Sequence, residues 1–169
     1  MVIKGLFQSN PVKTRHDDYF TRYETWASIA DLIPRGKVLW EAFYSPQSSS
    51  GEHFRNLGFD VIFEDVDFFE ADLGEVLVSN MPFSKKKEIF TRLKALGKPF
   101  IMLVPTTTLQ TLYFTELFKD ETIQLIIPRK KINFDKYVDG VKVKMRDNCT
   151  FYSCFIAWKC DIHKDVIFI

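Results

Sequence analysis

An amide, a proline and an aromatic ring follow directly on an apolar run, and together they could bind a planar amino group. The run covers residues 76–79, and Asn80-Met81-Pro82-Phe83 comes next. The Asn80 side-chain oxygen and the Met81 carbonyl could accept the two hydrogens of an amine whose lone pair is delocalised into a ring. Phe83 would stack on that ring, while Pro82 fixes its own φ and biases Met81 toward extended geometry. Such acceptors favour the positive charge that develops as a nitrogen attacks an electrophile, which is the requirement of methyl transfer to an amine.

The same four residues have a plainer interpretation. Asn and Pro are common turn residues, so the segment could simply end a strand and bury Phe83 in the core. Its position favours chemistry, because ligands of open α/β sheets bind at the carboxyl ends of the strands. Both interpretations stay open on these residues alone.

Residues 78–84 resemble the Asn-Pro-Pro-Phe motif of class I S-adenosylmethionine-dependent methyltransferases, in particular those that methylate the amino group of adenine. Met81 stands where the family has its first proline. Other segments match in the same order over about residues 17 to 134. The likeness is strongest to small adenine methyltransferase-like proteins of phages and large DNA viruses.

This resemblance implies a site for S-adenosylmethionine beside the motif. Trp40-Glu41-Ala42-Phe43 is similar to the Glu-Pro-Phe segment that opens the cofactor loop of the family, which places Glu41 and Phe43 at the cofactor. The loop that follows is serine-rich, and Gly51 alone remains of the glycines that let the backbone approach the cofactor closely. Serine hydroxyls and N–H groups could still bind a carboxylate, although an ordinary solvated connection has the same composition.

Further segments complete the set of candidate cofactor residues. An acidic residue at the end of the second strand binds ribose hydroxyls in dinucleotide-type folds, and by resemblance this role falls on Asp65. Asp67 and Phe68 lie in a segment that looks like the lining of the family's adenine pocket, and Thr21 lies in one that resembles its N-terminal cofactor element. Alternatively, the acids cap turns, Phe68 is a core residue and Thr21 caps the next helix.

Charge is distributed unevenly along the chain. Residues 1–84 carry seven Lys and Arg against 13 Asp and Glu, whereas residues 85–169 carry 16 against nine. Two dense basic clusters each follow a predicted strand, where a nucleic acid passing over the sheet edge could meet them. Ordinary solvated loops would look the same. The clusters are Lys85, Lys86 and Lys87, and Arg129, Lys130 and Lys131.

Alternating strand-like and helical patterns predict an α/β fold with a doubly wound, Rossmann-like, mostly parallel sheet. The last two apolar runs have no clear helix between them and fit an antiparallel edge pair. The family resemblance implies seven strands with one reversed, although the third strand is weak here. The strand-like runs are residues 37–43, 60–64, 76–79, 100–104, 123–127, 151–158 and 165–169.

Length and composition fit one methyltransferase-like domain over residues 1–169, without a separate target-recognition domain. A chain that is 46% hydrophobic and 15% aromatic can bury a substantial core. No apolar run approaches the roughly 20 residues that cross a bilayer, and the N-terminus lacks a signal-peptide pattern, so a soluble intracellular protein is expected. Three cysteines and three histidines show no ligand spacing, so no metal site is expected.

The sequence therefore predicts an enzyme that transfers a methyl group from S-adenosylmethionine to an amino nitrogen, first of all adenine N6 in DNA or RNA. Nucleic acid is the expected partner, and a protein partner could add specificity. Two alternatives remain open. One is methylation of a glutamine side-chain amide in a protein, because that nitrogen is also planar. The other is a methyltransferase-like binding or scaffold module that no longer binds the cofactor.

Overall fold

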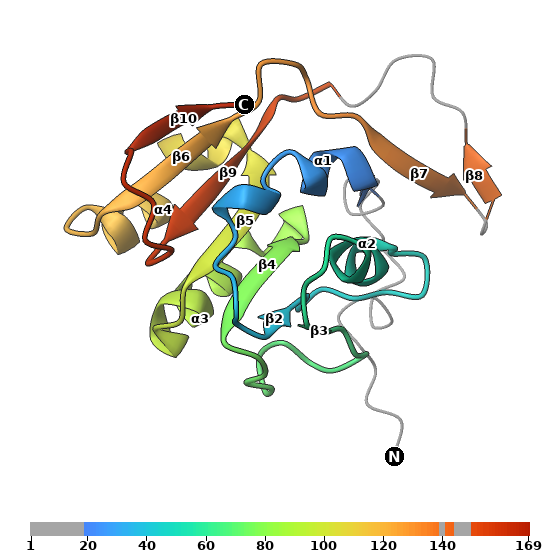
Figure 1. Ribbon diagram of the computed structural model, residues 1–169. Coiled ribbons are helices and arrows are strands. Elements are labelled where there is room, and N and C mark those ends of the chain that lie inside the picture. The colour runs from blue at the N-terminus through green and yellow to red at the C-terminus, as the bar shows by residue number, and fades with distance from the viewer. Residues whose placement is uncertain (1–18, 139–140, 144–149) are drawn as a thin grey trace.

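A seven-stranded sheet with helices on both faces forms the centre of the computed structural model, which describes residues 19–138, 141–143 and 150–169 (Figure 1). The strand order is β10-β6-β9-β5-β4-β2-β3. The strands are β2 (Leu39–Trp40), β3 (Val61–Ile62), β4 (Val76–Asn80), β5 (Phe100–Pro105), β6 (Ile123–Ile127), β9 (Ser153–Trp158) and β10 (Val166–Phe168).

All seven strands are parallel except β9, which pairs antiparallel with both β5 and β6. The predicted mostly parallel, doubly wound sheet with one reversed strand is thereby confirmed. The last two strands do not pair with each other, because β6 lies between them and β10 runs parallel to β6 at the sheet edge. Residues 63–75 form no strand, so the weak third strand of the expected pattern is missing and β10 brings the sheet to seven.

Two helical layers cover the sheet. Helices α1 (Tyr23–Ala27) and α2 (Ser50–Asn56) lie on one face, and α3 (Lys86–Leu96) and α4 (Leu112–Phe118) lie on the other. Three short 3-10 helices are also present: η1 (Ala30–Leu32), η2 (Phe83–Lys85) and η3 (Thr106–Gln110). In β5, Ile101 and Leu103 belong to the first core while Phe100, Met102 and Val104 belong to the second, as the alternation of a strand requires. A strand buried on both faces explains why this run is apolar throughout.

Helix ends follow the sequence signals in part. Gly97 ends α3 with φ +67°, and its N–H donates to the carbonyls of Leu93 and Lys94, as expected for a glycine at a helix C-terminus. Pro82 leaves the chain extended and a 3-10 turn intervenes, so α3 begins at Lys86 without a side-chain cap.

A second, small sheet consists of β1 (Tyr19–Thr21), β7 (Phe134–Val138) and β8 (Val141–Val143), all antiparallel. Strands β7 and β8 extend away from the main sheet beyond α2 (Figure 1). Thr21 belongs to β1, and the residue at the N-cap of α1 is Arg22, so Thr21 does not cap that helix. In the described part of the chain, no helix is long and apolar enough to cross a membrane.

Candidate functional site

A pocket at the carboxyl ends of β2 and β4 brings most of the candidate site residues together. It is small, with a cavity volume of about 30 Å³, and β1 forms one of its walls. All four candidate catalytic residues line it, and so do three of the seven candidate cofactor residues. These are Asn80, Met81, Pro82 and Phe83 from the end of β4, Glu41 and Phe43 from beyond β2, and Thr21 from β1.

Asn80 lines this pocket and carries a buried acceptor without a partner among the described residues. Its Nδ2 donates a hydrogen bond of 3.0 Å to the backbone carbonyl of Tyr19 in β1. Because a carbonyl oxygen can only accept, the NH₂ end of the amide must face β1, which leaves Oδ1 on the other side. Oδ1 is buried and has no hydrogen-bond partner among the described residues. A buried acceptor without a donor costs free energy, so this atom is suited to a donor brought by a ligand.

Phe83 lies at the mouth of the pocket within a group of aromatic rings. Its centroid is 6.5 Å from that of Tyr19, with an interplanar angle of 27°, and 5.2 Å from that of Phe151 in an edge-on arrangement. The Lys86 ammonium lies 5.9 Å from the same ring. Phe83 is half-buried. The Phe83 ring therefore packs against other side chains, as a strand-ending turn would require, and also borders the pocket, as a substrate-stacking role would require.

Glu41 is a buried carboxyl group at the base of the pocket. It is only 2% exposed, and its Oε1 accepts hydrogen bonds from the Ser79 hydroxyl and the Phe43 N–H. Its Oε2 has no partner among the described residues. Burial raises the pKa of Glu41 to about 7 and outweighs both hydrogen bonds, which lower it. A cation bound near Glu41 would stabilise its ionised form, because an opposite charge favours a carboxylate.

Two hydroxyl groups of the same pocket also lack partners among the described residues. Thr21 Oγ1 and Ser45 Oγ are buried, line the same pocket and have no hydrogen-bond partner in the described part of the chain. Ser48 and Ser50 complete this wall, and Ser50 Oγ accepts a bond of 3.0 Å from the Trp26 indole N–H. The serine-rich loop thus turns toward the pocket instead of pointing only into solvent.

The other four candidate cofactor residues lie outside this pocket. Gly51 is the second residue of α2, and a Cβ added there would overlap the ring of Phe63. Because residue 51 has no side chain, the Phe63 ring can lie in the space where the resemblance implies a cofactor. Asp65 is exposed in the segment that follows β3.

Asp67 and Phe68 have structural roles in the segment between β3 and β4. Asp67 Oδ1 accepts a hydrogen bond of 2.8 Å from the Phe69 N–H, which stabilises a turn. Phe68 is completely buried, and its ring lies 5.7 Å from that of Trp40 and 4.9 Å from that of Phe43. Their assignment to an adenine pocket stays a prediction.

The two basic clusters lie at different distances from the pocket. Lys85 and Lys87 are exposed directly after Phe83, and Lys86 is half-buried, which lowers its pKa. The cluster Arg129, Lys130 and Lys131 is exposed after β6. Three strand spacings separate β6 from β4, or roughly 14 Å along the sheet. Neither cluster lines the pocket, but the first begins two residues after Phe83, which does.

Tyr19 and Phe20, which precede Thr21 in the segment that resembles the N-terminal cofactor element, also line the pocket from β1. Their place at the pocket depends on pairing with β7, more than 110 residues later. Cys154 and Cys160 are buried free thiols, whereas Cys149 and His16 lie outside the described residues. No group of three or more His, Cys, Asp or Glu in the described ranges could hold a metal ion.

No family model matches the chain, and no curated protein matches its sequence. Two solved structures show a distant similarity to the chain. The precorrin-6y C5,15-methyltransferase of Geobacter metallireducens GS-15 is 15% identical with a TM-score of 0.42, over 89% of this chain and 100% of that one. A proposed methyltransferase of Thermoplasma acidophilum is 10% identical with a TM-score of 0.37, over 92% of this chain and 86% of that one. Because both likenesses are this distant, any function has to follow from the pocket itself.

Proposed function

We propose that this protein transfers a methyl group from S-adenosylmethionine to an amino nitrogen, first of all N6 of adenine in a nucleic acid. The observation that carries the proposal is the Asn80 amide, which belongs to a residue that lines the pocket: its NH₂ end is bound to Tyr19, and its buried Oδ1 has no partner among the described residues. An acceptor fixed in this way suits a substrate that brings an N–H donor.

The residues of the pocket define how such a transfer would be assisted. S-adenosylmethionine, when bound, supplies an electrophilic methyl group on a sulfonium. Asn80 Oδ1 and the Met81 carbonyl would accept the two amino hydrogens, and both hydrogen bonds strengthen as the nitrogen becomes positive. Phe83 would hold the plane of the base, and the surplus proton would leave to solvent after transfer. The chain contributes position and electrostatics, with no covalent intermediate.

The methionine end of the donor fits the orphaned polar atoms at the base of the pocket. An ammonium group offers three N–H donors, and the oxygens of Glu41, Thr21 and Ser45 that lack partners among the described residues are three acceptors. Its charge would also return Glu41 to its ionised form. The nucleoside end fits less well, because Phe63 packs on Gly51 and Asp65 is exposed, so the Phe63 ring would have to turn to admit it.

Nucleic acid as the substrate is supported by the cations around Phe83. Lys85, Lys86 and Lys87 begin two residues after Phe83 and could neutralise phosphates on either side of an extruded nucleotide. An adenine in a duplex must leave the base stack to reach a pocket of this kind. An unpaired adenine would need no such step.

The test is to supply the protein with isotopically labelled S-adenosylmethionine and to separate DNA, RNA and protein after reaction. We expect label in N6-methyladenine with the wild type and, at equal times, on the order of a hundredfold less with Asn80→Ala. Label on a glutamine side chain would instead establish the amide alternative. Label in no fraction, at donor concentrations that saturate a known methyltransferase run in parallel, would contradict the proposal.

One observation favours the non-catalytic module as a second candidate. The Phe63 ring, which lies 5.7 Å from the ring of Tyr44, occupies the space above Gly51 and closes the side of the loop where a nucleoside would lie. If Phe63 never leaves that position, the fold keeps its pocket but cannot bind the whole donor. Phe63→Ala would then create binding of S-adenosylmethionine that the wild type lacks, which calorimetry would detect.

A further inference from the structure

Strand β1 connects the pocket to the small sheet. It contains three residues, and β7 is its only strand partner among the described residues, through the pairs Tyr19 with Lys136, Phe20 with Asp135 and Thr21 with Phe134. So short a strand is not stable without further contacts. The hydrogen bond from Asn80 to the Tyr19 carbonyl therefore depends on whatever holds β1 in place.

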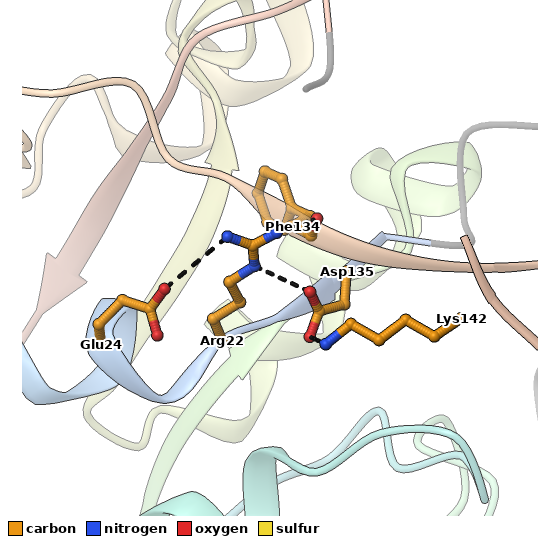
Figure 2. Close-up of polar contacts among 5 residues, drawn as sticks. All are labelled: Arg22, Glu24, Phe134, Asp135 and Lys142. Atoms are coloured by element: carbon orange, nitrogen blue, oxygen red, sulfur yellow. Dashed lines mark hydrogen bonds and ion pairs between the residues drawn. The ribbon is translucent and has the colours of Figure 1, made fainter. Parts of the chain in front are cut away.

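Asp135 in β7 links β8 to Arg22, the residue that follows β1 (Figure 2). Its Oδ1 accepts a hydrogen bond of 2.8 Å from Nε of Arg22, the residue directly after β1. Its Oδ2 accepts a bond of 2.8 Å from Nζ of Lys142 in β8. Arg22 also donates to the Phe134 carbonyl at 3.4 Å and lies 3.9 Å from the Glu24 carboxylate. Both oxygens of one carboxylate are thus occupied by cations from the two sides of β7.

The geometry of this bridge distinguishes it from an ordinary surface ion pair. The Asp135 side chain is 20% exposed, and both of its hydrogen bonds are charge-assisted and short. Burial alone would raise the pKa of Asp135, but the hydrogen bonds from Lys142 and Arg22 outweigh it and lower that pKa. The carboxylate therefore stays ionised at neutral pH, and the bridge persists under ordinary conditions.

We propose that Asp135 is a positioning residue for Asn80. By fixing Arg22 against β7 and β8, it keeps the Tyr19 carbonyl at hydrogen-bond distance from Asn80 Nδ2, and so keeps Asn80 Oδ1 directed at the pocket. Without this bridge the Asn80 amide can rotate and present its NH₂ group, which cannot accept a hydrogen from a substrate amine. The consequence for turnover rests on the proposed function, whereas the orientation of the amide does not.

Nuclear magnetic resonance of the Asn80 side-chain NH₂ group tests this directly, without donor or substrate. The resonance pair is assigned by its loss in Asn80→Asp. In the wild type we expect one of its two protons to exchange slowly with water, because it is bound to the Tyr19 carbonyl. In Asp135→Asn we expect both protons to exchange at similar, faster rates and the pair to move toward the shift of a free amide.

Matched variants separate positioning from general destabilisation. Lys119→Met removes an exposed ion pair with Glu116 in α4, and Ile126→Val weakens the core in β6; neither should move the Asn80 resonance. Asp135→Glu keeps the charge and should restore part of the slow exchange. If Asp135→Asn does not fold, Lys142→Met removes one of the two cations and should give a smaller change in the same direction.

An Asn80 resonance unchanged in a folded Asp135→Asn protein would overturn the inference. With an active preparation, Asp135→Asn should lower kcat roughly ten- to hundredfold while the KM for S-adenosylmethionine changes little. Equal effects on both constants would also contradict positioning. Absence of donor binding would refute the proposed function and leave the resonance result intact, so the two failures are distinguishable.

Discussion

Replacing Glu41 by glutamine should remove a loss of stability that the wild type undergoes as pH rises. In the folded protein, burial raises the pKa of Glu41 from 4.5 to about 7. A carboxyl group with a raised pKa binds its proton more tightly in the folded than in the unfolded chain. Its contribution to stability is therefore complete below pH 4.5 and is lost as the pH rises through about 7.

The magnitude follows from the size of this difference. A change from 4.5 to about 7 corresponds to roughly 3 kcal/mol of unfolding free energy, since each pH unit is worth about 1.4 kcal/mol. Most of it is lost between about pH 5 and about pH 8. Glutamine at position 41 stays neutral and can accept the same hydrogen bonds from Ser79 and Phe43, so the variant should lack this dependence.

Urea unfolding of both proteins at pH 5 and pH 8.5 measures the effect. We expect the stability of Glu41→Gln relative to wild type to increase by roughly 2–3 kcal/mol between the two pH values. Glu70→Gln, at an exposed carboxylate, serves as the control and should show no such change. Parallel pH profiles for wild type and Glu41→Gln would refute the argument that this carboxyl group is buried without a compensating charge.

Further predictions concern the motif, the loop and the core. Asn80→Ala should lower turnover on the order of a hundredfold, as measured by steady-state kinetics, and leave donor affinity nearly unchanged, as measured by calorimetry. An unchanged rate would remove Asn80 from the mechanism. Gly51→Ala should lower the free energy of unfolding by about 1–3 kcal/mol, because the alanine Cβ would overlap the Phe63 ring. An unaltered urea midpoint would mean that the ring moves freely. Burial raises the pKa of Cys154 to about 11 and that of Cys160 to about 12. Treatment with a thiol reagent at pH 8, followed by mass mapping, should therefore find both cysteines unmodified in the native protein and modified in urea. Rapid labelling of the native protein would show that the core opens.

Much of the fold could be predicted from local signals. The run at residues 123–127 is β6 itself, and Gly97 ends α3 as its conformational freedom suggests. The strands expected at 37–43 and 60–64 shrink to two residues each, because only Leu39–Trp40 and Val61–Ile62 find neighbours in the sheet. Pairing, which is not local, decides where a strand ends.

The candidate site was partly predictable for the same reason. Glu41 follows β2 and Asn80 is the last residue of β4, its parallel neighbour, so their convergence follows from the fold. The resemblance predicted a role for Thr21 at the pocket, but the pairing that positions β1 could not be foreseen, since Tyr19–Thr21 pairs with a segment more than 110 residues later. Nor could the sequence reveal that Phe63 fills the space above Gly51, because composition does not tell which side chain occupies a gap.

Titration of the protein with S-adenosylmethionine in a calorimeter tests the central claim most directly. We expect saturable binding of one donor per chain that is tighter at pH 8 than at pH 6, with proton release near pH 7, because an ammonium beside Glu41 favours its ionised form. Glu41→Gln should weaken binding and abolish the proton release. A flat titration at both pH values, with wild type and with Phe63→Ala, would contradict a donor site in this pocket.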